Sequence, residues 1–313
     1  MSDIATSTRA VRSAESITVD LTAFLVGIAL SLGFARVVFP GWSAPLWLDE
    51  SFTGAIALAP NVTALIDWCL HEVGGPVYYC FIWAWTQLFG ASNIALRLPG
   101  LIFLGLSVLV ILRWGHGQRE VRWTWAALLI LWPAAGYYAS EARSYPLILL
   151  LATVQVIAFI RLIDIGGRRH ALLWATVTAV LVLTHYHALV IGGLQGLAYL
   201  AVRHREFRRT WPTMLVFLPV VGWMVIHIPF LLTFAVPGVA WYPTLTVDQI
   251  FSMPFWQATW GGIQALVLLW MMAGAFVWQQ FKAISARRPP TGEQLLVGSA
   301  LLACGEAISR YRY

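Results

Sequence analysis

Two carboxylates, Asp49 and Glu50, stand side by side in the stretch LWLDESF, directly after a long apolar run. A carboxylate at an apolar boundary can deprotonate a hydroxyl nucleophile or hold a divalent metal, and acids at membrane depth are functional candidates. Neighbouring residues on a helix point in different directions, so one acid can face a site while the other faces water. The alternative is that Asp49 caps a helix that begins near Ser51. The sequence leaves both interpretations open.

A second acid with a cation beside it occurs in YYASEARSY (137–145), where Glu141 and Arg143 close one apolar segment before another begins. The planar fork of Arg143 suits a phosphate, and Glu141 can add a second carboxylate to a metal or sugar site. The alternative is a solvated loop ion pair, worth less than about 1 kcal/mol.

Two histidines, His185 and His187, lie in THYHA at a predicted hairpin turn. Neutral imidazole is a ligand for zinc and other transition metals. Because side chains two residues apart on a helix diverge, we expect at most one of them to bind a metal. A structural histidine, buried or at the membrane interface, is the alternative.

The composition is that of an integral membrane protein, with 59% hydrophobic and 11% charged residues in 313 and a mean hydropathy of +0.74. Apolar runs long enough to cross a bilayer recur along the chain, which predicts an all-α, polytopic bundle of transmembrane helices. We predict about ten segments, at 18–40, 73–90, 98–114, 123–139, 146–163, 171–186, 188–203, 211–235, 261–281 and 294–308.

The net charge of +6 comes largely from arginines in short loops between these runs, for example around 113–122 and 203–209. This is positive-inside patterning, typical of cytoplasmic loops, and it argues against a nucleic-acid partner. With those loops inside, the outer face is rich in acids: Asp49, Glu50, Asp67, Glu72, Glu141 and Asp248. The first outer loop, between 40 and 74, is predicted to hold two short amphipathic helices, WLDESFTGAIALAP and NVTALIDWCLHE.

The topology contains one inconsistency. A cytoplasmic N-terminus puts Asp49 outside, yet two further crossings would put the basic loop at Arg113 outside as well. The segment 73–90, short and interrupted by Gln87, is the suspect and can be a partial or interfacial helix. Alternatively, the loop at Arg113 is an exception to the charge rule.

Several stretches occur in the same order as in bacterial membrane glycosyltransferases of the GT-C fold: LWLDES, GGPVYYCFIWAWTQLFGASNIALRLPG, YYASEARSYPLILLLA, LTHYHALVIGGLQ and WYPTLTVDQI. Within that fold the chain resembles family 39 and the protein-mannosyltransferase-like enzymes, relatives of the lipid A aminoarabinose transferase. The resemblance covers about 18–313. It implies one transmembrane glycosyltransferase domain over 1–313, in the inner membrane of a bacterial cell, with its active site facing the periplasm.

The activity that the resemblance implies is transfer of a sugar from a polyprenyl-phosphate carrier to a lipid, glycan or protein of the cell envelope, without a nucleotide cofactor. Asp49 would be the catalytic base and Glu50 its neighbour. Substrate-binding positions would be Glu72, Tyr78, Glu141, Arg143, Tyr145, His185, Trp241 and Tyr242. A divalent cation is expected to assist, with Asp49, Glu141 and His185 as its candidate ligands. Further arginines for the carrier phosphate would be Arg36, Arg310 and Arg312.

Two departures from the family pattern favour other interpretations. The family commonly has His-Pro-Pro where this chain has Gly74 and Gly75, and it continues with further membrane helices after a motif like the final SRYRY. The chain is therefore expected to lack the C-terminal helices of the family. An inactive scaffold of the same fold is one alternative function. A multi-pass transporter or lipid flippase is another, although no inverted repeat is evident.

Overall fold

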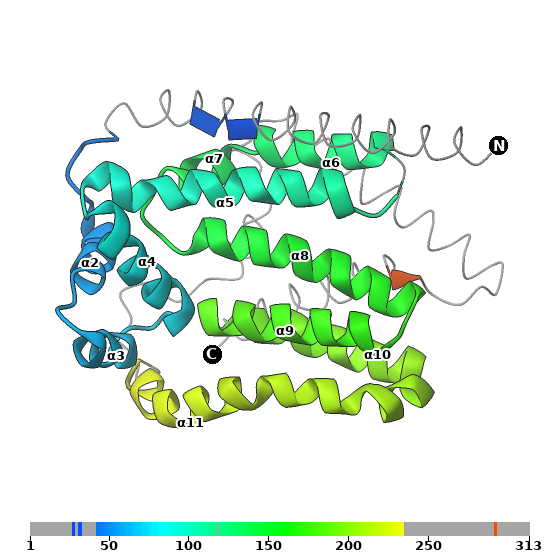
Figure 1. The fold of residues 1–313 in the computed structure, drawn as a ribbon. Coiled ribbons are helices and arrows are strands. Elements are labelled where there is room, and N and C mark those ends of the chain that lie inside the picture. The colour runs from blue at the N-terminus through cyan, green and yellow to red at the C-terminus, as the bar shows by residue number, and fades with distance from the viewer. Residues whose placement is uncertain (1–26, 29–30, 33–41, 118, 235–290, 293–313) are drawn as a thin grey trace, which may run out of the picture. The chain divides into compact units, whose positions relative to one another are not determined.

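The computed structural model describes residues 27–28, 31–32, 42–117, 119–234 and 291–292, which are drawn as ribbons in Figure 1. These residues contain helices and no strand, so the all-α prediction is confirmed for this part of the chain. The helices are α2 Leu48–Ala57, α3 Val62–Leu70, α4 Pro76–Phe89, α5 Asn93–Trp114, α6 Arg119–Leu131, α7 Pro133–Ala139, α8 Tyr145–Asp164, α9 Arg168–Thr184, α10 Ala188–Thr210, the 3-10 helix η1 Trp211–Phe217 and α11 Leu218–Thr233.

The chain divides into two compact units. The first comprises 1–60 and 78–154, and the second comprises 61–77 and 155–313. Helix α8 passes from the first unit into the second. Helices α2 and α3 lie where two short helices were predicted. Their place in an outer loop stays a prediction. The prediction of one membrane domain concerns all of 1–313 and stays a prediction.

In the first unit, α5 and α6 lie side by side, as Figure 1 shows. Leu104, Val108 and Ile111 of α5 pack with Ala126 and Leu129 of α6 in a buried apolar cluster. The single segment predicted at 123–139 is two helices. Proline has no N–H to donate and suits the first turn of a helix, so α7 begins anew at Pro133.

Helix α7 crosses α5 at Gly100, where the two backbones nearly touch. A Cβ atom added at Gly100 would lie 2.4 Å from the carbonyl oxygen of Ala139. This is too short for a contact between two non-bonded atoms, so the crossing requires glycine at this position. At the end of α7 the Ser140 hydroxyl donates a hydrogen bond to the Tyr137 carbonyl, at 2.6 Å. The start of the loop 140–144 is therefore fixed against α5.

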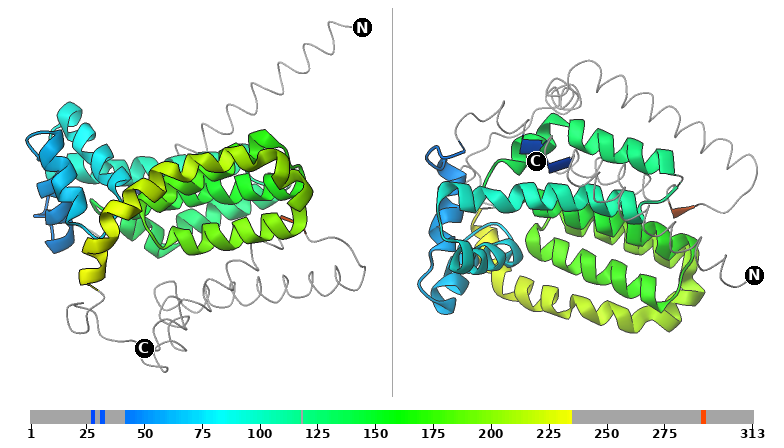
Figure 2. Two further views of the ribbon diagram at one scale, coloured as in Figure 1. Left: turned by 90° about the horizontal axis from the view of Figure 1, so that it is seen from below. Right: turned by 45° about the horizontal axis from the view of Figure 1, so that its top comes forward.

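The second unit packs α9 against α10, η1 and α11, which lie side by side in Figure 2. Its apolar core includes Phe159, Leu162, Trp174 and Tyr199. Helix α10 is kinked at Arg203, where φ is −121° and ψ is 32°. The loop before α4 joins this unit through a hydrogen bond from the Gly75 N–H to the Thr184 carbonyl, at 3.3 Å.

Three described stretches are long and apolar enough to cross a membrane: Asn93–Trp114, Tyr145–Asp164 and Ala188–Thr233. They support a membrane protein. Helix α4, with 14 residues, is only about 21 Å long and is shorter than a hydrocarbon core of about 30 Å. It falls in the segment that the charge pattern marks as suspect. The segments predicted at 261–281 and 294–308, and most of 18–40, lie outside the described residues, so the count of ten stays a prediction.

Candidate active site

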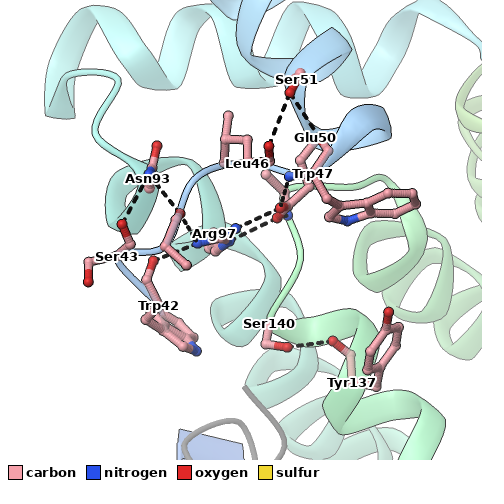
Figure 3. Close-up of polar contacts among 12 residues, drawn as sticks. Trp42, Ser43, Leu46, Trp47, Glu50, Ser51, Asn93, Arg97, Tyr137 and Ser140 are labelled. Carbon is pink, nitrogen blue, oxygen red and sulfur yellow. Dashed lines mark hydrogen bonds and ion pairs between the residues drawn. The ribbon is translucent and has the colours of Figure 1, made fainter. Parts of the chain in front are cut away.

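A buried ion pair joins α2 to α5 in the first unit. Arg97 on α5 donates from Nε to Glu50 Oε1 at 2.8 Å and from Nη2 to Oε2 at 2.6 Å, the two parallel bonds drawn in Figure 3. Both side chains are 0% exposed. Such a pair needs its remaining donors and acceptors satisfied to compensate for the loss of hydration.

Those remaining groups are satisfied by the chain that precedes α2. Arg97 Nη1 donates to the carbonyls of Trp42, at 2.7 Å, and Ala44, at 3.1 Å. One turn earlier on α5, Asn93 Nδ2 donates to the same Ala44 carbonyl, at 2.8 Å. The first two turns of α5 therefore hold 42–44 in place and fix where α2 begins (Figure 3).

The start of α2 corrects one interpretation of the sequence. The helix begins at Leu48 with Trp47 as its flanking residue, so Asp49 lies inside the first turn and does not cap a helix at Ser51. Glu50, in contrast, accepts a hydrogen bond from the Trp47 N–H, at 3.3 Å. This frees the Asp49 carboxylate for a contact outside its own helix.

Consecutive residues of the loop 140–144 contact the two adjacent acids of α2. The Ala142 N–H donates to Glu50 Oε1 at 2.8 Å. On one side of Ala142, Arg143 Nη1 forms an ion pair with Asp49 Oδ2 at 2.7 Å. Asp49 is 33% exposed and Arg143 is 24% exposed. The adjacent acids thus have different partners: Glu50 accepts a hydrogen bond from the loop backbone, and Asp49 forms a partly exposed ion pair with Arg143.

On the other side of Ala142, Glu141 is only 1% exposed. Neither carboxyl oxygen has a hydrogen-bond partner in the described part of the chain. Burial raises the pKa of Glu141, and the Tyr137 hydroxyl, which interacts with this carboxyl without hydrogen-bond geometry, opposes the shift only in part. Because an unpaired buried carboxylate is costly, the neutral acid is favoured here. Burial and this carboxyl raise the pKa of Tyr137 to about 12.

The charges of Glu50 and Arg143 are stabilised instead. Burial alone would raise the pKa of Glu50, but the hydrogen bonds from Arg97, Ala142 and Trp47 outweigh it, so the pKa falls below its ordinary value. Burial likewise opposes the charged form of Arg143, yet Tyr145 and Asp49 outweigh it and raise its pKa. Both groups therefore stay ionised at neutral pH.

Aromatic side chains surround the exposed ion pair. The Arg143 guanidinium lies 5.4 Å from the centre of the Tyr145 ring, and its Nη2 is 3.4 Å from the Tyr145 hydroxyl. The Tyr145 ring also packs on Tyr138, at 4.6 Å. Tyr78 is buried, and burial raises the pKa of its hydroxyl. Four predicted substrate-binding residues thus belong to the same unit as the acids: Tyr78, Glu141, Arg143 and Tyr145.

The two histidines lie in the second unit. His185 follows the last residue of α9 with extended backbone angles, φ −157° and ψ 121°, and His187 precedes α10. The expectation that the rings diverge is wrong, because no helix runs through this turn: their Nδ1 atoms are 3.3 Å apart. Glu72 also belongs to this unit. Trp241 and Tyr242 lie outside the described residues, as do Arg36, Arg310 and Arg312.

Among the buried charged side chains and histidines of the described residues, two were not predicted. Arg97 is one, although an arginine at the start of an apolar run is a signal that sequence analysis can use. His227 is the other, in the middle of α11. Its Nδ1 lies 2.6 Å from the Tyr186 hydroxyl, which also accepts a hydrogen bond from Trp223 Nε1, at 2.9 Å.

Among the residues that the structure describes, no three side chains of histidine, cysteine, aspartate or glutamate gather as a metal site. The expected cation with its ligands Asp49, Glu141 and His185 stays a prediction. Comparisons with protein-family models, curated proteins and solved structures found no match. The resemblance to GT-C glycosyltransferases therefore stays an expectation drawn from the order of the sequence motifs.

Proposed function

We propose that this protein transfers a sugar from a polyprenyl-phosphate carrier to a hydroxyl group of an acceptor at the outer face of a membrane. The observation that carries the proposal is the half-exposed pair of Asp49 and Arg143, held in register by the buried pair of Glu50 and Arg97. A base beside a phosphate-binding cation is the minimum that such a transfer needs.

Arg143 would receive the carrier phosphate. The guanidinium fork matches two phosphate oxygens, and its present carboxylate partner is only partly buried. A phosphate that binds Arg143 competes with Asp49 and releases that carboxylate. Binding of the donor would thereby free the base next to the sugar.

The reaction is then a single displacement. The acceptor oxygen forms a bond to the anomeric carbon while the bond from that carbon to the phosphate oxygen breaks. The lipid phosphate leaves with the electron pair and is stabilised by Arg143. Asp49 takes the proton of the acceptor hydroxyl.

The neighbouring acids have supporting roles in this proposal. The Glu50 carboxylate accepts hydrogen bonds from Arg97, Ala142 and Trp47. These bonds suit a structural brace, a residue that positions the loop and α2, rather than a proton acceptor. Burial raises the pKa of Glu141, which has no hydrogen-bond partner in the described residues, and its protonated form can donate a hydrogen bond to an oxygen of the sugar or phosphate.

The test is transfer of label by the purified full chain in proteoliposomes. Polyprenyl phosphates that carry radiolabelled sugars are supplied together with cell-envelope acceptors, and both pools are followed over time. Label that moves from the carrier to an acceptor supports the proposal. Label that crosses the bilayer on an intact carrier would instead establish a flippase, and label that stays on the carrier on its original side would indicate an inactive scaffold.

A further inference from the structure

A basic pocket lies at the turn between α8 and α9 in the second unit. The turn is made by Gly166 and Gly167, whose φ angles of 77° and 93° favour glycine. The pocket has a volume of about 440 Å³ and is lined by Gly167, Arg168, Arg205, Glu206, Arg209 and Thr210.

The acid in this lining is already engaged. Glu206 Oε2 pairs with Arg203 Nη1 at 3.2 Å, and its Oε1 accepts a hydrogen bond from the Gly167 N–H. Arg203 in turn donates to the carbonyls that end α8, with distances of 2.6 Å to Ile163 and 3.1 Å to Asp164. This network joins the turn after α8 to α10 beside the pocket.

The three arginines of the lining have no acid partner in the described chain. The ion pairs found there do not include Arg168, Arg205 or Arg209. Arg205 and Arg209 are four residues apart on α10, so they lie on the same face and repel each other. With Glu206 already neutralised by Arg203, the pocket holds an excess of positive charge.

The start of α9 adds to this excess. Its first residues are Arg168, Arg169 and His170, with no acid in the first turn, and the Glu206 carboxylate at the Gly167 N–H is already paired with Arg203. Cations near the N-terminus of a helix are unfavourable, because the free N–H groups there carry partial positive charge. A bound anion would relieve both this repulsion and that between Arg205 and Arg209.

The surroundings indicate a lipid rather than a soluble anion. Helix α8, which is long enough to cross a membrane, ends at this turn. Apolar side chains next to the pocket in sequence are exposed: Ile165, Leu172, Leu173 and Trp211. Tryptophan is typical of the membrane interface, where an acyl chain meets its headgroup.

We propose that this pocket binds the phosphate headgroup of an anionic phospholipid, with the acyl chains lying along the apolar side chains around it. Arginine forks bind phosphate oxygens, and basic pockets at the ends of membrane helices are suited to such headgroups. This inference concerns a different part of the chain from the proposed active site and does not depend on sugar transfer.

The first test uses the unmodified full chain. Detergent-solubilised protein is titrated with phosphatidylglycerol or phosphatidylcholine, and bound lipid is counted by native mass spectrometry. We expect phosphatidylglycerol to be retained at least about tenfold more strongly, and millimolar inorganic phosphate to leave it bound. Equal retention of the two lipids would overturn the proposal, and so would complete displacement by inorganic phosphate.

The second test locates the site with matched variants. Arg205→Gln/Arg209→Gln removes two charges from the pocket, and Arg169→Gln/Arg208→Gln removes two charges from the same helices outside its lining. Only the pocket variant is expected to lose the preference for phosphatidylglycerol, while far-ultraviolet circular dichroism verifies that both variants are folded. An equal loss in the two variants would mean general attraction to basic loops and would refute a specific site.

Discussion

The arginines of the candidate active site and those that line the basic pocket differ in their partners. In the first unit, Arg97 and Arg143 each bind a carboxylate, and the Arg97 pair is closed off from solvent. In the second unit, Arg168, Arg205 and Arg209 line one pocket without an acid partner among the described residues. In the first cluster, carboxylates balance both arginines before any ligand binds. In the second, no described acid balances the three arginines, and we propose that an anion does so.

A second contrast lies inside the first unit, between two ion pairs that start from adjacent residues. Glu50 and Arg97 are 0% exposed, whereas Asp49 is 33% exposed. We expect the difference in burial to separate a structural pair from a reactive one. The buried carboxylate and arginine cannot exchange partners without unpaired charge in the interior, whereas the partly exposed pair can open when a substrate binds. The predictions below test that separation.

Glu50→Ala is expected to have the largest effect on stability. It leaves Arg97 buried without its counterion, a loss of about 3–5 kcal/mol in the free energy of unfolding. Unfolding by denaturant in detergent would measure it, with the exposed acid variant Asp67→Ala as the control. A loss of less than about 1 kcal/mol for Glu50→Ala would contradict the role of a brace.

Arg143→Lys is expected to weaken donor binding and leave the fold unchanged. Lysine keeps the charge but loses the planar fork that matches phosphate, so KM for the polyprenyl-phosphate donor should rise about tenfold. Steady-state kinetics would show it, with Arg119→Lys, an exposed arginine on α6, as the matched control. An unchanged KM would remove Arg143 from the donor site.

Glu141→Gln is expected to change how stability depends on pH. The folded state raises the pKa of Glu141, so it retains a proton that the unfolded chain releases. The free energy of unfolding should therefore fall as pH rises from about 4.5 to the raised pKa, by about 1.4 kcal/mol for each pH unit in that range. Glutamine does not ionise, so thermal unfolding of the variant should lack this decline, and the same decline in both proteins would contradict the assignment.

Glu50 should show the opposite pH dependence, because its pKa is lowered in the folded state. The stability that its ionised form provides is present above its ordinary pKa and is lost as pH falls through the lowered value. The unfolding temperature of the wild-type chain should therefore drop again below about pH 4.5. A flat profile in acid would be inconsistent with a buried, ionised Glu50.

Asp49→Asn is expected to have the smallest effect on stability. A partly exposed ion pair contributes less than about 1 kcal/mol, so the free energy of unfolding should change little. The same denaturant titration would measure it beside Glu50→Ala. If the two variants lost similar stability, the division between a brace and a reactive pair would be wrong.

Helix positions could be predicted from the sequence, but the contacts between residues far apart in the chain could not. Amphipathic spacing predicted two short helices between 40 and 74, where α2 and α3 lie. The break at Pro133 was not predicted, although the missing N–H of proline explains it. That Glu50 binds Arg97, 47 residues away, depends on how α2 and α5 pack, which no local pattern encodes. Asp49 was considered as a helix cap because the position at which α2 begins is also set by that packing.

The turn with His185 and His187 shows that the exact end of a helix is also difficult to predict from the sequence. Divergence of His185 and His187 follows only if one helix runs through both, and here α9 ends before His185 while α10 begins after His187. A two-residue error in a helix end thus reverses the predicted geometry of a possible ligand pair. The kink in α10 at Arg203 has no proline or glycine at that position to signal it.

The most direct measurement is the turnover of sugar transfer by Asp49→Asn, compared with the wild type and with the matched variant Asp67→Asn at equal amounts of folded protein. The account predicts that Asp49→Asn transfers sugar about 100- to 10,000-fold more slowly, while Asp67→Asn is unaffected. Turnover by Asp49→Asn within about twofold of the wild type would contradict the assignment of Asp49 as the base.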